Sequence, residues 1–145
     1  MADLTAKRDV RLQPGEILPF KQAAVKVLEG ALVMVNAAGY LTKAADTASC
    51  HFAGVADKTV DNSAGAAGDL KNHVRMEGVI DVAVADTITI ANVGDEVFAS
   101  DDQTVALVGT TTNDVFVGRI VEFVSANKAR VALAPFGAKR SDLIE

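Results

Sequence analysis

Alternation of apolar and polar positions is the strongest signal along this chain. Over residues 79–84 every second residue is a large aliphatic one, and the positions between them hold Val, Asp or Ala. A period of two is typical of a β-strand that buries one face. From residue 23 onward, glycines recur at spacings that suit one strand and one turn. The pattern predicts an antiparallel all-β domain.

Other segments are rich in Val, Ile, Thr and Phe and lie between these glycines. No stretch of the chain has the sustained spacing of an amphipathic helix, although residues 41–50 have the composition of a short one. The segments predicted as strands, in addition to 79–84, are 24–28, 31–35, 52–57, 73–76, 96–99, 104–108, 115–124 and 129–134.

The first 22 residues differ from the rest and are predicted to form an extended arm, followed by a β-barrel domain over 23–145. The segment mixes charges with prolines and has no strand or helix period. Pro14-Gly15 has the composition of a turn, and Pro19 favours an extended path. An arm of this kind can add to the edge of a partner's sheet. The residues predicted to make that contact are Arg8, Val10, Arg11, Leu12, Pro14 and Ile17. The alternative, left open here, is that the arm folds back on its own barrel.

The segment 115–124 is apolar on both faces and is predicted to lie at an interface between subunits. A strand with apolar residues on its two faces needs cover over each face, and a small domain cannot easily cover both faces of one strand by itself. A three-fold arrangement would bury the second face. The predicted interface residues are Val115, Val117, Arg119, Val121 and Phe123.

Composition and charge exclude several classes of function. The 145 residues fit one domain, and the formal net charge of −5 does not suit binding to nucleic acid. There is no Trp, and aromatic residues make up 5% of the chain, which disfavours an aromatic-lined ligand pocket. No apolar run is long enough to span a membrane, and the N-terminus has no secretion signal. These features predict a protein that is soluble and cytoplasmic when made.

The residues needed for catalysis or metal binding are scarce. The single Cys50 is predicted to be a buried, inert thiol, and its neighbour His51 would point to the opposite face of a strand. With His73, these are too few for a zinc site. We therefore predict no catalytic residues, no metal and no cofactor. One fragment, Gly78-Val79-Ile80-Asp81, resembles a motif of trimeric dUTPases, but the aromatic residue expected shortly after the Asp is missing.

A broader resemblance covers most of the chain and rests on the order and spacing of several short segments. After the arm come Glu29-Gly30-Ala31-Leu32-Val33, Gly39-Tyr40-Leu41-Thr42, Phe52-Ala53-Gly54-Val55-Ala56, Val93-Gly94-Asp95-Glu96-Val97-Phe98, Val117-Gly118-Arg119-Ile120-Val121 and Ala129-Arg130-Val131-Ala132-Leu133. In this order the chain resembles the capsid decoration, or cement, proteins of tailed bacteriophages, of the short β-barrel type.

That resemblance implies a fold, a role and partners. The fold would be a small antiparallel β-barrel or sandwich, β-tulip-like, with an N-terminal arm. The role would be structural: a homotrimer on the outer face of the virion that binds the major capsid protein and stabilises its lattice. The alternatives are another non-enzymatic virion or adaptor module, such as a head fibre base or spike, and a dUTPase-like hydrolase.

Overall fold

The computed structural model describes residues 16–136 and 138, and these residues form an all-β protein. The predicted fold class is confirmed. The elements are β1 (Ile17–Lys21), β2 (Lys26–Val27), β3 (Leu32–Val35), β4 (Leu41–Lys43), β5 (His51–Ala56), β6 (Val60–Asp61), β7 (Lys71–Arg75), β8 (Val79–Val84), the 3-10 turn η1 (Ile90–Asn92), β9 (Glu96–Ala99), β10 (Thr104–Leu107), β11 (Phe116–Ser125) and β12 (Lys128–Leu133).

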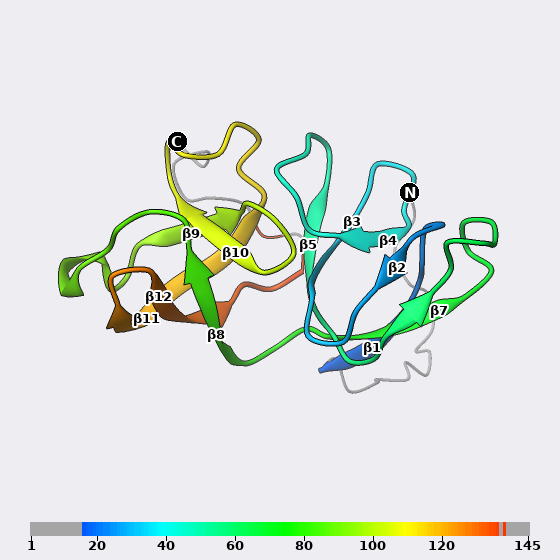
Figure 1. The fold of residues 1–145 in the computed structure, drawn as a ribbon, viewed down its shortest axis with the longest axis horizontal. Helices are drawn as coiled ribbons and strands as arrows, with labels where there is room; N and C mark the ends of the chain where they lie inside the picture. The colour runs from blue at the N-terminus through cyan, green and yellow to red at the C-terminus, as the bar shows by residue number, and fades with distance from the viewer. Residues whose placement is uncertain (1–15, 137, 139–145) are drawn as a thin grey trace, which may run out of the picture.

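The strands form two halves that lie side by side in Figure 1. The first half is a five-stranded antiparallel sheet in the order β1-β7-β5-β3-β4, with the short pair β2-β6 beside it. A bridge between Gln22 and Leu41 connects the end of β1 to the start of β4. The sheet therefore curls almost into a barrel around its own small core, which includes Val33 and Val74.

The second half is a closed barrel in the order β10-β8-β12-β11-β9. Its strands pair antiparallel except for β8 and β10, which run parallel. Val82 and Val84 are buried while Asp81 and Ala83 are exposed, so the alternation that predicts β8 also predicts its buried face. Because the barrel is closed, its interior needs no second subunit to cover it.

One hydrophobic core extends across the junction between the halves. Leu32, Met34 and Phe52 belong to the sheet but pack with the barrel residues that include Val84 and Val97. The main chain is joined there as well, since Leu32 N donates to the carbonyl oxygen of Asp102 at 2.8 Å. The two halves are thus parts of one packed unit.

Residues 17–21 form an edge strand, in contrast to the extended arm predicted for 1–22. β1 pairs with β7 in the register Ile17↔Arg75 to Lys21↔Lys71. Met76 N donates to Glu16 O, so residues 16, 18 and 20 bond to β7, and Pro19 faces the open edge where its missing N–H costs nothing. Residues 1–15, which are the remainder of the predicted arm, lie outside the described residues.

The segment 41–50 is not a helix. Leu41–Lys43 is strand β4, paired with β3, and the residues after it form a loop. The alanines of this segment favour a helix locally, but Leu41 is fully buried by pairing with Val35, and burial outweighs propensity.

Buried polar side chains hold parts of the first half together through hydrogen bonds. The amide of Gln22 donates to the carbonyl oxygens of Val25 and Val60 at 2.8 and 2.9 Å, and its own oxygen accepts from Asn72 Nδ2 at 3.1 Å. Asn62 donates to the carbonyls of Gln22, Ala23 and Ala66. This network holds the β6–β7 loop against the end of β1, so Gln22 belongs to the folded core and not to an arm.

Candidate interaction surfaces

The first candidate surface is the open edge of β1. Ile17 is 43% exposed there and is the one residue of the predicted capsid-binding set that the structure describes. Arg8, Val10, Arg11, Leu12 and Pro14 lie outside the described residues. Among the described residues no strand pairs with the outward main-chain groups of Ile17, Pro19 offers only its carbonyl, and the end of β1 is already joined to β4 by the bridge between Gln22 and Leu41. This edge can accept or extend a sheet.

The second candidate surface is β11, whose predicted interface residues divide between the inside and outside of the barrel. Val115 and Val117 are buried in the barrel's own core, and Phe123 packs against it. Arg119 and Val121 point outward and are exposed. The pairing of β11 with β9 and β12 is irregular, and each shift in register changes which residues of the strand face the barrel interior. This is one reason why apolar residues occur at both odd and even positions of the strand, and the sequence alone does not reveal it.

Four exposed apolar side chains lie on β11 or on the segment at η1 that packs against it. Ile90 and Val93, on and just after η1, are 72% and 42% exposed, and η1 packs against β11. Val121 and Val124 on β11 are 46% and 42% exposed. We refer to Ile90, Val93, Val121 and Val124 as the β11 patch. Exposed apolar side chains gathered in this way are typical of protein interfaces.

Charged side chains form a ladder on the outer face of the barrel beside this patch. Arg130 on β12 donates to Asp81 on β8 at 2.9 Å and also bonds Glu122 on β11. The hydrogen bond that Arg130 donates to Asp81 and the nearby charge of Glu122 raise the pKa of Arg130. Elsewhere on β11, the guanidinium of Arg119 lies 3.7 Å from the carboxylate of Glu96 on β9 and donates a hydrogen bond to Gly94 O. Asp81, the acid of the dUTPase-like fragment, is therefore engaged in a surface ion pair.

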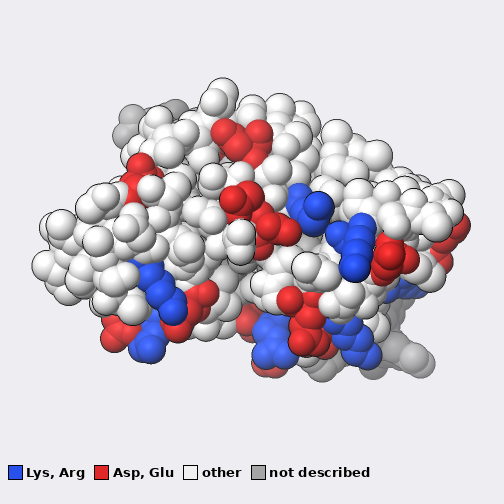
Figure 2. Space-filling model, viewed as in Figure 1, with Lys and Arg blue, Asp and Glu red and all other residues white. Residues whose placement is uncertain are grey.

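The charges are mixed over the face drawn in Figure 2. Lys and Arg side chains there lie beside Asp and Glu and form no continuous basic area on that face, and the uppermost charged side chains are acidic. A surface of this kind does not attract a polyanion through counterion release. Specific contacts with a partner must therefore come from the shape of the surface, its exposed apolar area and its open strand edges.

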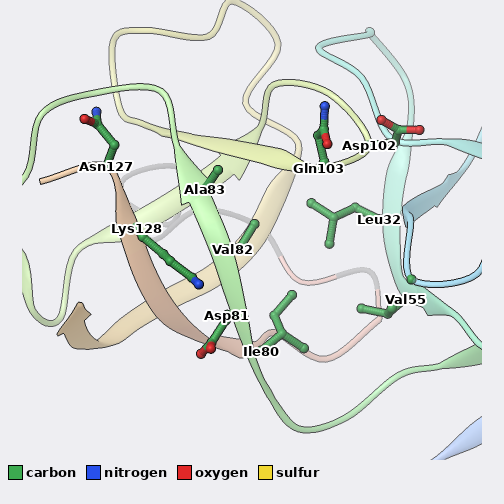
Figure 3. A pocket seen from close by; sticks show the side chains of 11 residues that line it. Leu32, Val55, Ile80, Asp81, Val82, Ala83, Asp102, Gln103, Asn127 and Lys128 are labelled. Carbon is green, nitrogen blue, oxygen red and sulfur yellow. The ribbon is translucent and has the colours of Figure 1, made fainter. Parts of the chain in front are cut away.

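A groove of about 560 Å³ separates the two halves on the same side of the molecule. Figure 3 shows Ile80 and Val82 pointing from β8 toward Leu32 and Val55 of the first half. Asp102 stands at the upper end of the groove. The groove has an apolar floor, and the carboxylates of Asp81 and Asp102 belong to its lining.

The residues considered for chemistry are separate in the structure. His51 and His73 are both exposed on their strands. Cys50 is half-buried, with its thiol 3.5 Å from Ala48 O, and burial raises the pKa of that thiol. Within residues 16–136 and 138, no group of His, Cys, Asp and Glu is arranged to hold a metal ion. No helix among those residues has the length and apolarity to cross a membrane.

Taken together, these features define a small two-part β protein whose notable surfaces are strand edges, an apolar patch and a groove. The sequence matches the model of the phage cement protein family over residues 12–135, which includes every strand of both halves. The chain belongs to that family, as the resemblance predicts. No curated protein matches the sequence.

Proposed function

We propose that this protein binds the outer face of a phage capsid as a homotrimer and cements the lattice of the major capsid protein. Membership of the cement family carries the proposal, because the match extends over nearly all the described residues. The family places the protein in the virion as a capsid-stabilising component. The trimer, the outer face, the capsid protein partner and synthesis in the host cytoplasm before assembly are our inferences.

The exposed surfaces support a division of roles within this function. The segment before Glu16, continuing from the open edge of β1, is the proposed capsid contact, through Arg8, Val10, Arg11, Leu12, Pro14 and Ile17. An extended segment forms main-chain hydrogen bonds with a sheet edge, and its alternate side chains fill shallow pockets. The β11 patch, together with Arg119, is the proposed contact between subunits. Three arms acting together would raise the avidity of a weak single contact.

The test is cosedimentation of the purified protein with capsids that lack it. We expect saturable binding at three copies per site and an increase in the temperature at which the capsids lose their DNA or disassemble. A deletion of residues 1–15 keeps β1 and should reduce capsid binding at least tenfold. The matched control is Leu4→Ala, which changes the same segment outside the proposed contact. Absence of binding by the full chain would refute the proposed function.

A further inference from the structure

Three buried amide side chains lie together in the first half of the molecule. Gln22 and Asn72 are fully buried and Asn62 is nearly so, although these residue types are mostly exposed in proteins. Water cannot reach such groups from the surface, and buried polar atoms almost always have a hydrogen-bond partner inside the protein. Each nitrogen and each oxygen of the three amides can therefore be checked for its partner.

The amide nitrogens are all engaged. Gln22 Nε2 donates to two backbone carbonyl oxygens, at 2.8 and 2.9 Å. Asn72 Nδ2 donates to Gln22 Oε1 at 3.1 Å and to Lys58 O at 3.2 Å. Asn62 Nδ2 faces three backbone carbonyl oxygens, at 2.9 to 3.2 Å. The cluster consequently has no spare N–H among its side chains to offer to another acceptor.

One acceptor in the cluster, Asn72 Oδ1, is buried and has no hydrogen-bond partner among the described residues. Reversing the Asn72 amide does not solve this, because its oxygen would then face two acceptors, Gln22 Oε1 and Lys58 O. Reversing the Gln22 amide as well would turn the oxygen of Gln22 toward the carbonyl oxygens of Val25 and Val60. The hydrogen bonds thus fix the orientation of both amides, and Asn72 Oδ1 needs a donor from elsewhere.

We propose that Asn72 Oδ1 accepts a hydrogen bond from one water molecule bound inside the first half. Leaving a buried acceptor unpaired costs free energy, and the neighbouring side-chain donors are already used. Buried waters in proteins typically bond to such polar groups, whereas apolar cavities stay dry. A metal cation fits less well, because it needs several oxygen ligands, and Gln22 Oε1 and Lys58 O already accept from Asn72 Nδ2.

The water would lie where three segments of the first half meet. Asn72 is on β7 and is paired with Phe20 of β1, while its amide reaches Lys58 in the loop between β5 and β6. The water is therefore a structural ligand that helps to hold the end of β1 in place. This inference goes beyond the proposed function and does not depend on it, because the site is in the interior and needs no capsid.

A high-resolution crystal structure of the full-length protein tests the proposal directly. We expect a water oxygen within about 2.6–3.0 Å of Asn72 Oδ1. A donor from another part of the chain in that place would overturn the proposal, and so would the lack of any donor there.

NMR cross-relaxation with water tests the same site in solution. At the Asn72 Nδ2 protons, a water that stays bound longer than the protein takes to tumble gives NOE and ROE signals of opposite sign. The exposed side-chain amide of Asn113 is the internal control, because surface water exchanges too fast to give this signature. The same behaviour at both amides would contradict a bound water at Asn72.

Asn72→Leu removes the acceptor with little change in side-chain size. Oxygen-17 relaxation dispersion should detect about one long-lived water fewer in this variant than in the wild type. Asn113→Leu, at the exposed amide, should leave the number of long-lived waters unchanged. An unchanged number in folded Asn72→Leu would overturn the proposal. If Asn72→Leu does not fold, the crystal structure and the NMR signals of the wild type decide the question without it.

Discussion

Asp46 and Asn113 join the two halves of the molecule through reciprocal hydrogen bonds. The carboxylate of Asp46 accepts from the backbone N–H of Asn113 at 2.8 Å and from that of Thr112 at 2.8 Å. In return, the side-chain amide of Asn113 donates to Asp46 O at 3.0 Å. The two residues lie 67 positions apart, and they tie the β4–β5 loop of the sheet to the β10–β11 loop of the barrel.

Replacement of Asp46 by Ala should weaken this junction. Two backbone N–H groups lose a charged acceptor, and because the site is partly exposed to water, we expect the free energy of unfolding to fall by about 1–2 kcal/mol. Urea denaturation would measure the loss, with Glu77→Ala as a control at an exposed acid on the linker between β7 and β8. A loss no larger than that of the control would show that the junction depends on apolar packing alone.

The same carboxylate should make stability depend on pH. Partial burial alone would raise the pKa of Asp46, but the hydrogen bonds from Thr112 and Asn113 outweigh it and leave the pKa below its ordinary value. A depressed carboxyl pKa means that the folded state binds the proton less readily than the unfolded state. Its contribution is therefore complete above the ordinary pKa near 3.8 and is lost as the pH falls below it. Denaturation midpoints between pH 6 and 2.5 should converge for wild type and Asp46→Ala at the acidic end.

Truncation at two positions should separate the arm from the sheet. Deletion of residues 1–15 leaves β1 intact, whereas deletion of 1–20 removes most of it, including Phe20, which packs on the core of the first half and lies 5.8 Å from the ring of Phe136. We expect the longer deletion to cost about 2–4 kcal/mol more than the shorter one. Thermal melts of both variants would measure this, and equal melting temperatures would indicate that β1 contributes little to the sheet.

Gly118 should tolerate no side chain. A Cβ built at this position would lie 2.0 Å from Ala132 O, so Gly118→Ala would force β11 away from β12. We expect a loss of at least about 3 kcal/mol. Gly94→Ala is the control, since Gly94 has φ +98° with open space around it and should cost only about 1 kcal/mol. If both variants unfold at the same denaturant concentration, β11 has freedom to shift.

The sequence predicts some features of this fold because local pattern and tertiary environment agree there. Val79–Val84 alternates in sequence and is buried on one face, and Glu96–Ala99 is predicted with the bounds it has. β1 is missed because Pro19 argues against a strand unless the strand is known to lie at an edge, which depends on the pairing of β7 50 or more residues later. β6 is missed because two residues are too short for a period.

The candidate surfaces are less predictable than the strands. Val115 and Val117 are grouped with Arg119 and Val121 by alternation, but the irregular pairing of β11 changes which residues face outward along the strand. Whether an apolar side chain lies inside a closed barrel or on a subunit contact depends on closure, and closure is made by β9 pairing with both β10 and β11. The composition of one strand does not contain that information.

The thiol of Cys50 should react slowly in the native protein. It is half-buried against the core, and burial raises its pKa, so the reactive thiolate is less populated than in an unfolded chain. Labelling by a chromogenic disulfide reagent at pH 8 should be at least tenfold slower than in urea. Cys50→Ser should leave the fold and capsid binding intact. Rapid native labelling accompanied by loss of capsid binding would contradict this prediction.

Val121 offers the clearest test of the proposed contact between subunits. It belongs to the β11 patch and is 46% exposed, so Val121→Asp should leave the barrel folded while adding a charge to a surface that a second subunit would cover. We expect the trimer, on the shell or in solution, to weaken at least tenfold, with a melting temperature of the separate chain within a few degrees of wild type.

Two matched controls separate this effect from general damage. Val79→Asp places the same charge at an exposed valine of β8, 58% exposed and outside the β11 patch, and should leave assembly unchanged. Val117→Asp buries the charge inside the closed barrel and should unfold the protein, because an unpaired carboxylate in the core costs several kcal/mol. Sedimentation velocity and copy number on capsids would measure assembly. If Val121→Asp and Val79→Asp assemble equally well, the subunits meet through a different surface and the β11 patch is free to face the shell.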